Sequence, residues 1–157
     1  MRNNIKKLFF LLAVVTLCAA CHSRRVYTGV IDVPTQGWNA DSALCFTFDV
    51  TEAQEATEWV VFVRHNTNYR FQNFWIFLDV TTPDGAVKSD TVECYLADQR
   101  GRWLGNGWGA LREMPILWHD KEALPEVGTY TLKVKQGMRT EQLKGIASIG
   151  LEIKKNK

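Results

Sequence analysis

The chain has 157 residues, 46% of them hydrophobic and 11% aromatic, with 19 basic residues against 17 acidic ones. This length and apolar content are sufficient for one domain with a buried core. Three of the basic residues lie in the first seven positions, so the chain from Cys21 onward carries 16 basic and 17 acidic residues and a formal charge of −1. The sequence therefore gives no electrostatic sign of nucleic-acid binding.

The first twenty residues have the pattern of an export signal. A basic start is followed by an apolar run over residues 8–17 and by two alanines before Cys21. The run is too short to span a bilayer stably and ends in small residues, as cleaved signals do. Cleavage before a cysteine is typical of bacterial lipoproteins, so we expect residues 1–20 to be removed and Cys21 to carry acyl chains such as palmitate. Cys18 stands where leucine is usual, which leaves an ordinary cleaved signal as the alternative.

Residues 21–25 are expected to be the lipidated cysteine and a short tether, and residues 26–157 a single domain. Five extended residues reach at most about 18 Å, so the domain would lie close to its membrane. Surface-displayed lipoproteins often carry acidic residues just after the cysteine, and none follow Cys21. This favours the periplasmic side of the outer membrane.

The rest of the sequence has the alternation and turn signals of β-structure. We expect strands over 26–33, 44–50, 59–63, 74–80, 92–96, 111–118, 130–135 and 149–153. Two of them, 59–63 and 74–80, are apolar at successive positions, which predicts strands covered on both faces. Residues 51–57 and 140–143 are each expected to form a turn or two of helix. The whole pattern predicts an all-β antiparallel sandwich of eight or nine strands, with a jelly roll among the connectivities that it allows.

Two cysteines, Cys45 and Cys94, lie in expected strands. An exported chain could oxidise them to one disulfide. The competing interpretation is that both are small apolar residues buried in the core, because spacing alone does not bring their α-carbons together.

Residues with catalytic or metal-binding chemistry are scattered. The histidines, His22, His65 and His119, are far apart and have no second ligand at the spacing of a zinc site. Glu93 and Asp98 could be imagined as a carboxylate pair for glycoside hydrolysis, but alternation places Glu93 on the outer face of a strand and Asp98 in a loop. We therefore expect no enzymatic activity, no metal and no cofactor.

A glycine-rich stretch surrounds two tryptophans, Trp103 and Trp108. A phosphate-binding loop would need a lysine and a helix start after the glycines, and neither is present. One interpretation is a tight hairpin whose glycines, Gly101, Gly105, Gly107 and Gly109, take conformations closed to other residues, with Trp103 clamping the hairpin to the sheet. The other is a loop that offers a tryptophan to a partner, since tryptophan is frequent in interface hot spots.

A polar and aromatic stretch over 64–75 joins two expected core strands. Arg64 continues the line of Val60 and Phe62, so it is expected to be partly buried and to need an acceptor such as the Asp79 carboxylate or a loop carbonyl. The asparagines of this stretch are expected to bond the backbone of the turn.

A family resemblance rests on residues spread over nearly all of the chain after Cys21. They are Arg64, Asn66, Tyr69, Asn73 and Trp75; Leu96-Ala97-Asp98 with Gly101, Trp103, Gly105 and Gly107; and Gly128-Thr129-Tyr130, Gln136, Met138-Arg139, Leu143, Gly145-Ile146 and Gly150-Leu151. Together with the signal that ends at a cysteine, this set resembles the GldH family of gliding-motility lipoproteins from the Bacteroidetes.

The resemblance implies a non-enzymatic envelope lipoprotein, an accessory or scaffold for gliding and type IX secretion that is held to the membrane through Cys21 and binds other envelope proteins. Of the residues singled out, we expect some to meet a partner: Trp108, Arg70 and Arg139. Others are expected to hold the fold: Arg64, Asn73, Trp103, Gly105 and Gly107. The alternative function is a carbohydrate-binding module that presents exposed aromatic side chains to a sugar, with Trp108, Trp118 and Tyr95 as candidates.

Overall fold

The computed structural model describes residues 24–156, which form ten β-strands and no helix. The expected signal peptide, residues 1–20, and Cys21 lie outside the described residues. The strands are β1 (Arg25–Asp32), β2 (Trp38–Asn39), β3 (Leu44–Val50), β4 (Gln54–Asn66), β5 (Asn73–Thr81), β6 (Val87–Tyr95), β7 (Leu111–Leu124), β8 (Gly128–Gln136), β9 (Gln142–Leu143) and β10 (Ile146–Lys155). The first strand already includes Arg25, the last residue of the expected tether.

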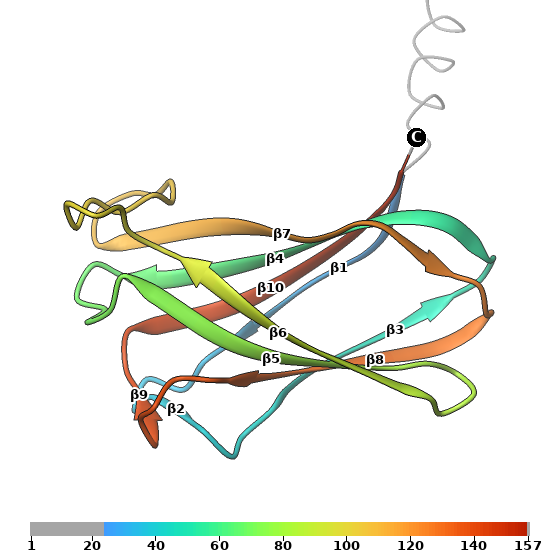
Figure 1. The fold of residues 1–157 in the computed structure, drawn as a ribbon, viewed down its shortest axis with the longest axis horizontal. Helices are drawn as coiled ribbons and strands as arrows, with labels where there is room; N and C mark the ends of the chain where they lie inside the picture. Colours follow the sequence, from blue (N-terminus) through green and yellow to red (C-terminus); the bar gives the residue numbers. More distant parts are fainter. Residues whose placement is uncertain (1–23, 157) are drawn as a thin grey trace, which may run out of the picture.

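The strands pair in a nested order. Antiparallel partners are β1 with β10, β2 with β9, β3 with β8, β4 with β7, and β5 with β6. Two further pairings, β10 with β4 and β5 with β8, complete two four-stranded sheets in the orders β1-β10-β4-β7 and β3-β8-β5-β6. These sheets face one another as two layers (Figure 1). A long hairpin rolled into two sheets in this way is a jelly roll, so the expected sandwich is confirmed.

The core lies between the two sheets and is filled by alternate residues of their strands. The expected inward sets of β8 and β10 are buried: Tyr130, Leu132, Val134, Ile149, Leu151 and Ile153. Tyr130 also closes a corner, because its hydroxyl donates to the Glu126 carbonyl oxygen at 3.2 Å, four residues upstream. A tyrosine bonded to the backbone at a strand corner is a common device of β-sandwiches.

The strands that were expected to be covered on both faces are fully covered on one, although Val60 and Phe62 on the outer face of β4 are partly buried. In β5, Phe74, Ile76 and Leu78 are fully buried, whereas Trp75 is 37% exposed and Phe77 is 46% exposed. The described residues place no third layer over the outer face of this sheet. Its outward aromatic side chains therefore remain at the surface.

Both expected helical turns are wrong. Over 51–57, the chain enters β4 at Gln54, and the Thr57 hydroxyl donates to the Glu122 carbonyl oxygen of β7 at 2.6 Å. Over 140–143, Leu143 is 1% exposed and pairs with Trp38 of β2. Pairing with strands distant in sequence overrides local preference in both places.

The two cysteines lie in different sheet environments and do not form a disulfide. Cys94 faces the core and is fully buried, whereas Cys45 is exposed on the outer face opposite Lys133. The expectation of burial is thus confirmed for Cys94 and wrong for Cys45. Burial raises the pKa of the Cys94 thiol to about 12, so this thiol stays protonated at neutral pH.

The sandwich has two unlike ends (Figure 1). At the terminal end, the start of β1 lies against the end of β10, and the Lys155 backbone N–H donates to the Arg24 carbonyl oxygen at 2.7 Å. The loop end carries the connections 67–72 and 96–110. A chain segment entering at Arg24 therefore meets the sandwich at the end opposite these loops.

Candidate functional site

The outer face of the sheet β3-β8-β5-β6 carries an open groove of about 630 Å³ near the loop end. We call it the aromatic groove. Apart from one glycine and one asparagine, its lining is aromatic, methionine or arginine: Phe71, Asn73, Trp75, Phe77, Gly137, Met138 and Arg139.

Gly137, the residue after β8, lies close to the two exposed rings of β5. Its backbone N–H donates to the Trp75 carbonyl oxygen at 2.7 Å. A Cβ at position 137 would lie 3.2 Å from the Phe77 ring and from the Trp75 Cβ, closer than most side-chain contacts. The Met138 sulfur in turn accepts a hydrogen bond from the Trp75 backbone N–H at 3.4 Å.

The buried Gln136 side chain fixes the segment that follows β8. Its Nε2 donates to the Thr140 carbonyl oxygen at 2.7 Å, and its Oε1 accepts from the Met138 backbone N–H at 2.8 Å. Gln136 is 2% exposed, so both bonds are shielded from water. Met138 and the exposed Arg139 are thereby held beside the groove.

A polar network borders the groove on the β6 side. The Asn73 side-chain amide donates to Glu93 Oε1 at 2.6 Å, and the Tyr95 hydroxyl donates to Glu93 Oε2 at 2.9 Å. Glu93 and Tyr95 point outward, as the alternation predicts. The bond to Glu93 raises the pKa of Tyr95, so its hydroxyl remains a donor at neutral pH.

The residues expected to meet a partner are not all together. Arg139 lines the aromatic groove, and the exposed Arg70 precedes its lining residue Phe71. Trp108 is 94% exposed and lies elsewhere, beside a shallow groove of the other sheet that also includes Phe62.

Arg64 is half-exposed, and its acceptor is not Asp79. Its Nη2 lies 2.6 Å from the Glu113 carboxylate on the neighbouring strand β7. Asp79 instead accepts a hydrogen bond from the Ser89 hydroxyl.

The glycine-rich loop lies against the start of β7. A Cβ at position 105 would be 2.5 Å from the Glu113 carbonyl oxygen, and one at 107 would be 2.0 Å from the Leu111 carbonyl oxygen. Only residues without a side chain allow this approach. Trp103 packs its ring 4.5 Å from the ring of the buried His65, measured between centroids.

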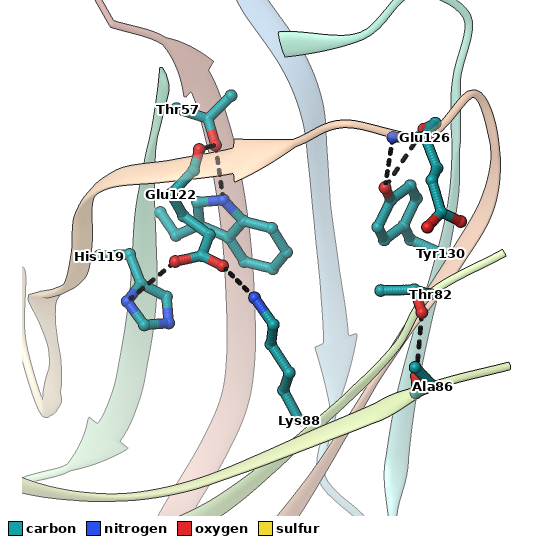
Figure 2. Close-up of polar contacts among 9 residues, drawn as sticks. Thr57, Thr82, Ala86, Lys88, His119, Glu122, Glu126 and Tyr130 are labelled. Carbon is teal, nitrogen blue, oxygen red and sulfur yellow. Dashed lines mark hydrogen bonds and ion pairs between the residues drawn. The ribbon is translucent and has the colours of Figure 1, made fainter. Parts of the chain in front are cut away.

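A second concave site, which we call the end pocket, opens between β6 and β7 and encloses about 400 Å³. Its floor is aromatic and aliphatic: Trp59, Val80, Leu124 and Tyr130. Figure 2 shows the Lys88 side chain reaching the Glu122 carboxylate, with His119 on the other side of the same carboxylate. The Lys88 ammonium donates to Glu122 Oε1 at 2.9 Å.

Sequence reasoning missed both concave sites. The available signal for the groove was a pair of outward aromatic residues in one strand, together with a glycine between Gln136 and Met138 much later in the sequence. The end pocket had no such signal, because its lining comes from β4, β5, β6, β7 and β8. The three aromatic residues expected for sugar binding are also dispersed. Tyr95 lies on the outer face near the groove, and Trp118 lines the end pocket. Trp108 is exposed in the glycine-rich loop.

Neither site has the donor set of a metal centre. Within residues 24–156, no three histidine, cysteine, aspartate or glutamate side chains are arranged so that they could hold a metal ion. The same residues include no helix long and apolar enough to cross a membrane.

Comparisons with known proteins give one consistent result. The model of the GldH lipoprotein family matches residues 25–153. A gliding motility lipoprotein GldH homolog of Christiangramia forsetii is 27% identical, over 99% of this chain and 99% of that protein. The gliding motility lipoprotein GldH of Flavobacterium johnsoniae is 30% identical, over 96% of this chain and 97% of that protein.

Solved structures show only a distant likeness. A family 35 carbohydrate-binding module of Clostridium thermocellum is 16% identical and aligns with 82% of this chain and 91% of that chain, at a TM-score of 0.38. This TM-score is too low to relate the functions of the two proteins.

Proposed function

Because the chain belongs to the GldH lipoprotein family, we propose that it is a lipid-anchored accessory or scaffold of the gliding and secretion apparatus in the cell envelope. Its relatives are named as gliding-motility lipoproteins and not as enzymes. Two concave surfaces among the described residues support a role in binding.

In this proposal, acyl chains on Cys21 hold the sandwich at the periplasmic side of the outer membrane. Each buried methylene contributes about 0.8 kcal/mol, so two or more chains make the anchoring stable. The described chain begins at Arg24, three residues after Cys21, and the loop end lies opposite this point. The groove and loops would then face away from the membrane, and confinement to its surface would raise their effective concentration near envelope partners.

The observation that carries the docking proposal is the composition of the aromatic groove. Aromatic side chains, methionine and arginine are the residues enriched at protein interfaces, and they make up most of its lining. Gln136 and Gly137 hold the groove in place before any partner arrives, which lowers the entropy lost on binding. We therefore propose that envelope proteins dock on the aromatic groove, with Arg139 meeting an acidic group of the partner.

Site-specific photo-crosslinking in the native host tests this docking. A photoreactive residue at Phe77 should crosslink a defined envelope protein, whereas one at Thr47 should not. Thr47 is the matched control, because it is exposed on the outer face of the same sheet. Arg139→Glu should reduce the Phe77 crosslink at least several-fold, and equal crosslinking at the two positions would refute the proposal.

A separate experiment tests the anchor. Cys21→Ser should leave the sandwich folded but release it from membranes, and function in surface gliding or secretion should be lost. Membrane fractionation reads the first effect and complementation of a deletion strain reads the second. Full function of a released Cys21→Ser protein would contradict the anchoring role while leaving the docking proposal open to the crosslinking result.

A further inference from the structure

The rim of the aromatic groove carries positive charge that the fold does not neutralise. Arg139 lines the groove, and Lys135 lies directly opposite the groove residue Phe77 where β5 pairs with β8. Arg70 immediately precedes another lining residue, Phe71. The three cationic side chains are exposed, and none has an ion pair or a side-chain hydrogen bond with another of residues 24–156.

The outward carboxylates of β5 and β6 already have partners. Glu93 accepts hydrogen bonds from Asn73 and Tyr95. Asp79 accepts a hydrogen bond from a hydroxyl of β6 and lies opposite Lys133. The three cations of the rim are therefore left without a carboxylate of their own, and an acidic guest would supply one.

The apolar part of the groove has the spacing of an extended chain. Trp75 and Phe77 are two residues apart on β5 and both are exposed on its outer face, so their positions are separated by about 6.6 Å along the strand. An extended peptide presents alternate side chains to one side at the same interval. Gly137, which lies close to both rings, adds no side chain to the lining. The groove therefore fits a guest whose apolar side chain lies over the rings, with an acidic residue two positions away on either side.

From this arrangement we propose that the aromatic groove binds an extended acidic segment of an envelope protein, in which two carboxylates flank an aromatic residue at every second position. The carboxylates reach Lys135 and Arg139, and the aromatic side chain packs on Trp75 and Phe77. Methionine and arginine, which are enriched at protein interfaces, favour a peptide over an acidic polysaccharide as the guest. This inference rests on the proposed function, because it names the chemistry of the partner that docks at the groove.

A titration of the full-length protein in a maltoside detergent with short blocked peptides tests the inference. The probe has the pattern Glu-Ser-Phe-Ser-Glu, and its control has lysine in place of both glutamates. In proton–nitrogen correlation spectra, the probe should shift the indole N–H resonance of Trp75 saturably and leave that of Trp118, in the end pocket, unchanged.

The acidic probe should bind at least tenfold more tightly than the basic control, and its affinity should fall in high salt. The absence of a saturable shift up to about 5 mM would overturn the inference, as would equal binding of the two peptides.

Two lysines on the outer face of β8 are a matched pair of variants. Lys135→Gln should weaken binding of the acidic probe several-fold. Lys133→Gln should leave the affinity nearly unchanged, because Lys133 lies opposite Asp79 and one outward position farther from the groove. Equal weakening in the two variants would contradict a guest seated beside Phe77.

An acidic sugar chain is the competing guest, and tighter binding of an oligogalacturonate than of the acidic peptide would overturn the choice of a peptide. The crosslink at Phe77 distinguishes failure of this inference from failure of the proposed function. If the acidic peptide does not bind but Phe77 still crosslinks an envelope protein, only the extended acidic segment is refuted. Loss of both results would refute docking at the aromatic groove itself.

Discussion

At the scale of single residues, the face of the strand decides the chemistry of the two cysteines. Cys45 and Cys94 both lie in strands of the sheet β3-β8-β5-β6, but Cys45 points to solvent and Cys94 points into the core. Apolar surroundings raise the pKa of the Cys94 thiol to about 12, and the thiolate is the reactive species.

We therefore expect iodoacetamide at neutral pH to label Cys45 in the folded protein and to label Cys94 only after denaturant is added. Peptide mass spectrometry of the two sites measures the labelled fractions. A reducing agent should leave the melting temperature unchanged, since the described residues contain no disulfide. Labelling of Cys94 as fast as Cys45 would contradict the buried position of its side chain.

His65 is the buried residue whose protonation should matter for stability. It is fully buried, its Nδ1 donates to the Asn66 carbonyl oxygen at 3.0 Å, and its Nε2 has no partner among residues 24–156. Burial is the main cause that lowers its pKa, with Arg112 adding to the effect. The folded protein therefore holds this imidazole neutral.

The sign of the pH effect follows from that lowered pKa. Below about pH 6.5 the unfolded chain binds a proton at His65 that the folded chain excludes. The free energy of unfolding should therefore fall as pH decreases from about 6.5 toward the folded pKa, by up to about 1.4 kcal/mol per pH unit from this group. Urea unfolding measures the decrease in the free energy of unfolding between about pH 7.5 and about pH 5.5. This decrease should be smaller in His65→Phe than in the wild type. An equal decrease in the two proteins would exclude His65 as the cause.

At the scale of elements, β4 and β7 are joined along most of their length, and the pair Arg64 and Glu113 lies on their outer face. The side chains are 40% and 39% exposed, so water screens their attraction. The sequence predicted that Arg64 would be partly buried and would need an acceptor. The register of β7 against β4, which brings Glu113 opposite it, was not readable from the pattern.

A double-mutant cycle with Arg64→Gln and Glu113→Gln should give a coupling energy below about 1 kcal/mol, because the pair is exposed. The coupling should decrease further in high salt. Urea denaturation of the four proteins measures it. A coupling energy well above this range would mean that the pair is shielded from water.

A substitution in the glycine-rich loop is expected to change the free energy of unfolding more than the loss of the Arg64–Glu113 pair. Gly107→Ala would place a Cβ 2.0 Å from the Leu111 carbonyl oxygen, so the loop must move away from β7. We expect a loss of about 1–3 kcal/mol in the free energy of unfolding, as for other overpacked sites. Gly107 does not have a positive φ, so backbone strain of that kind does not add to this loss. An unchanged free energy of unfolding for Gly107→Ala in chemical denaturation would contradict the close approach.

At the scale of the whole molecule, the nested pairing makes the fold depend on its last strand. β10 lies between β1 and β4 and supplies Ile149, Leu151 and Ile153 to the core. Because its partners are distant in sequence, the sandwich cannot form in parts as the chain elongates.

Removing residues 146–157 should therefore abolish cooperative unfolding and the dispersion of the proton spectrum. A circular permutant of residues 24–156 that joins Asn156 to Arg24 and opens at the exposed turn of Gly85 should keep both properties, because Lys155 is hydrogen-bonded to Arg24. Thermal melts followed by circular dichroism compare the two proteins. A cooperative transition in the truncated chain would show that β10 is dispensable.

The sequence alone determined the properties that depend on local periodicity and on spacing along the chain. The alternation in 130–135 and 149–153, the outward position of Glu93 and the all-β class were all readable because a strand exposes its two faces in turn. The family resemblance was also readable, because its motif is a linear set of residues. Strand ends were less accurate: β4 and β7 are longer than predicted because their outer segments are polar.

The tertiary structure alone decided which faces remain at the surface and which distant side chains meet. Trp75 and Phe77 line a groove because none of residues 24–156 forms a layer over that sheet face and because Gly137, some sixty residues later in the sequence, lies close beside them. The end pocket likewise joins five strands at the edge between two sheets. Periodicity specifies the inner and outer face of each strand, but only the register and stacking of the sheets specify its neighbours.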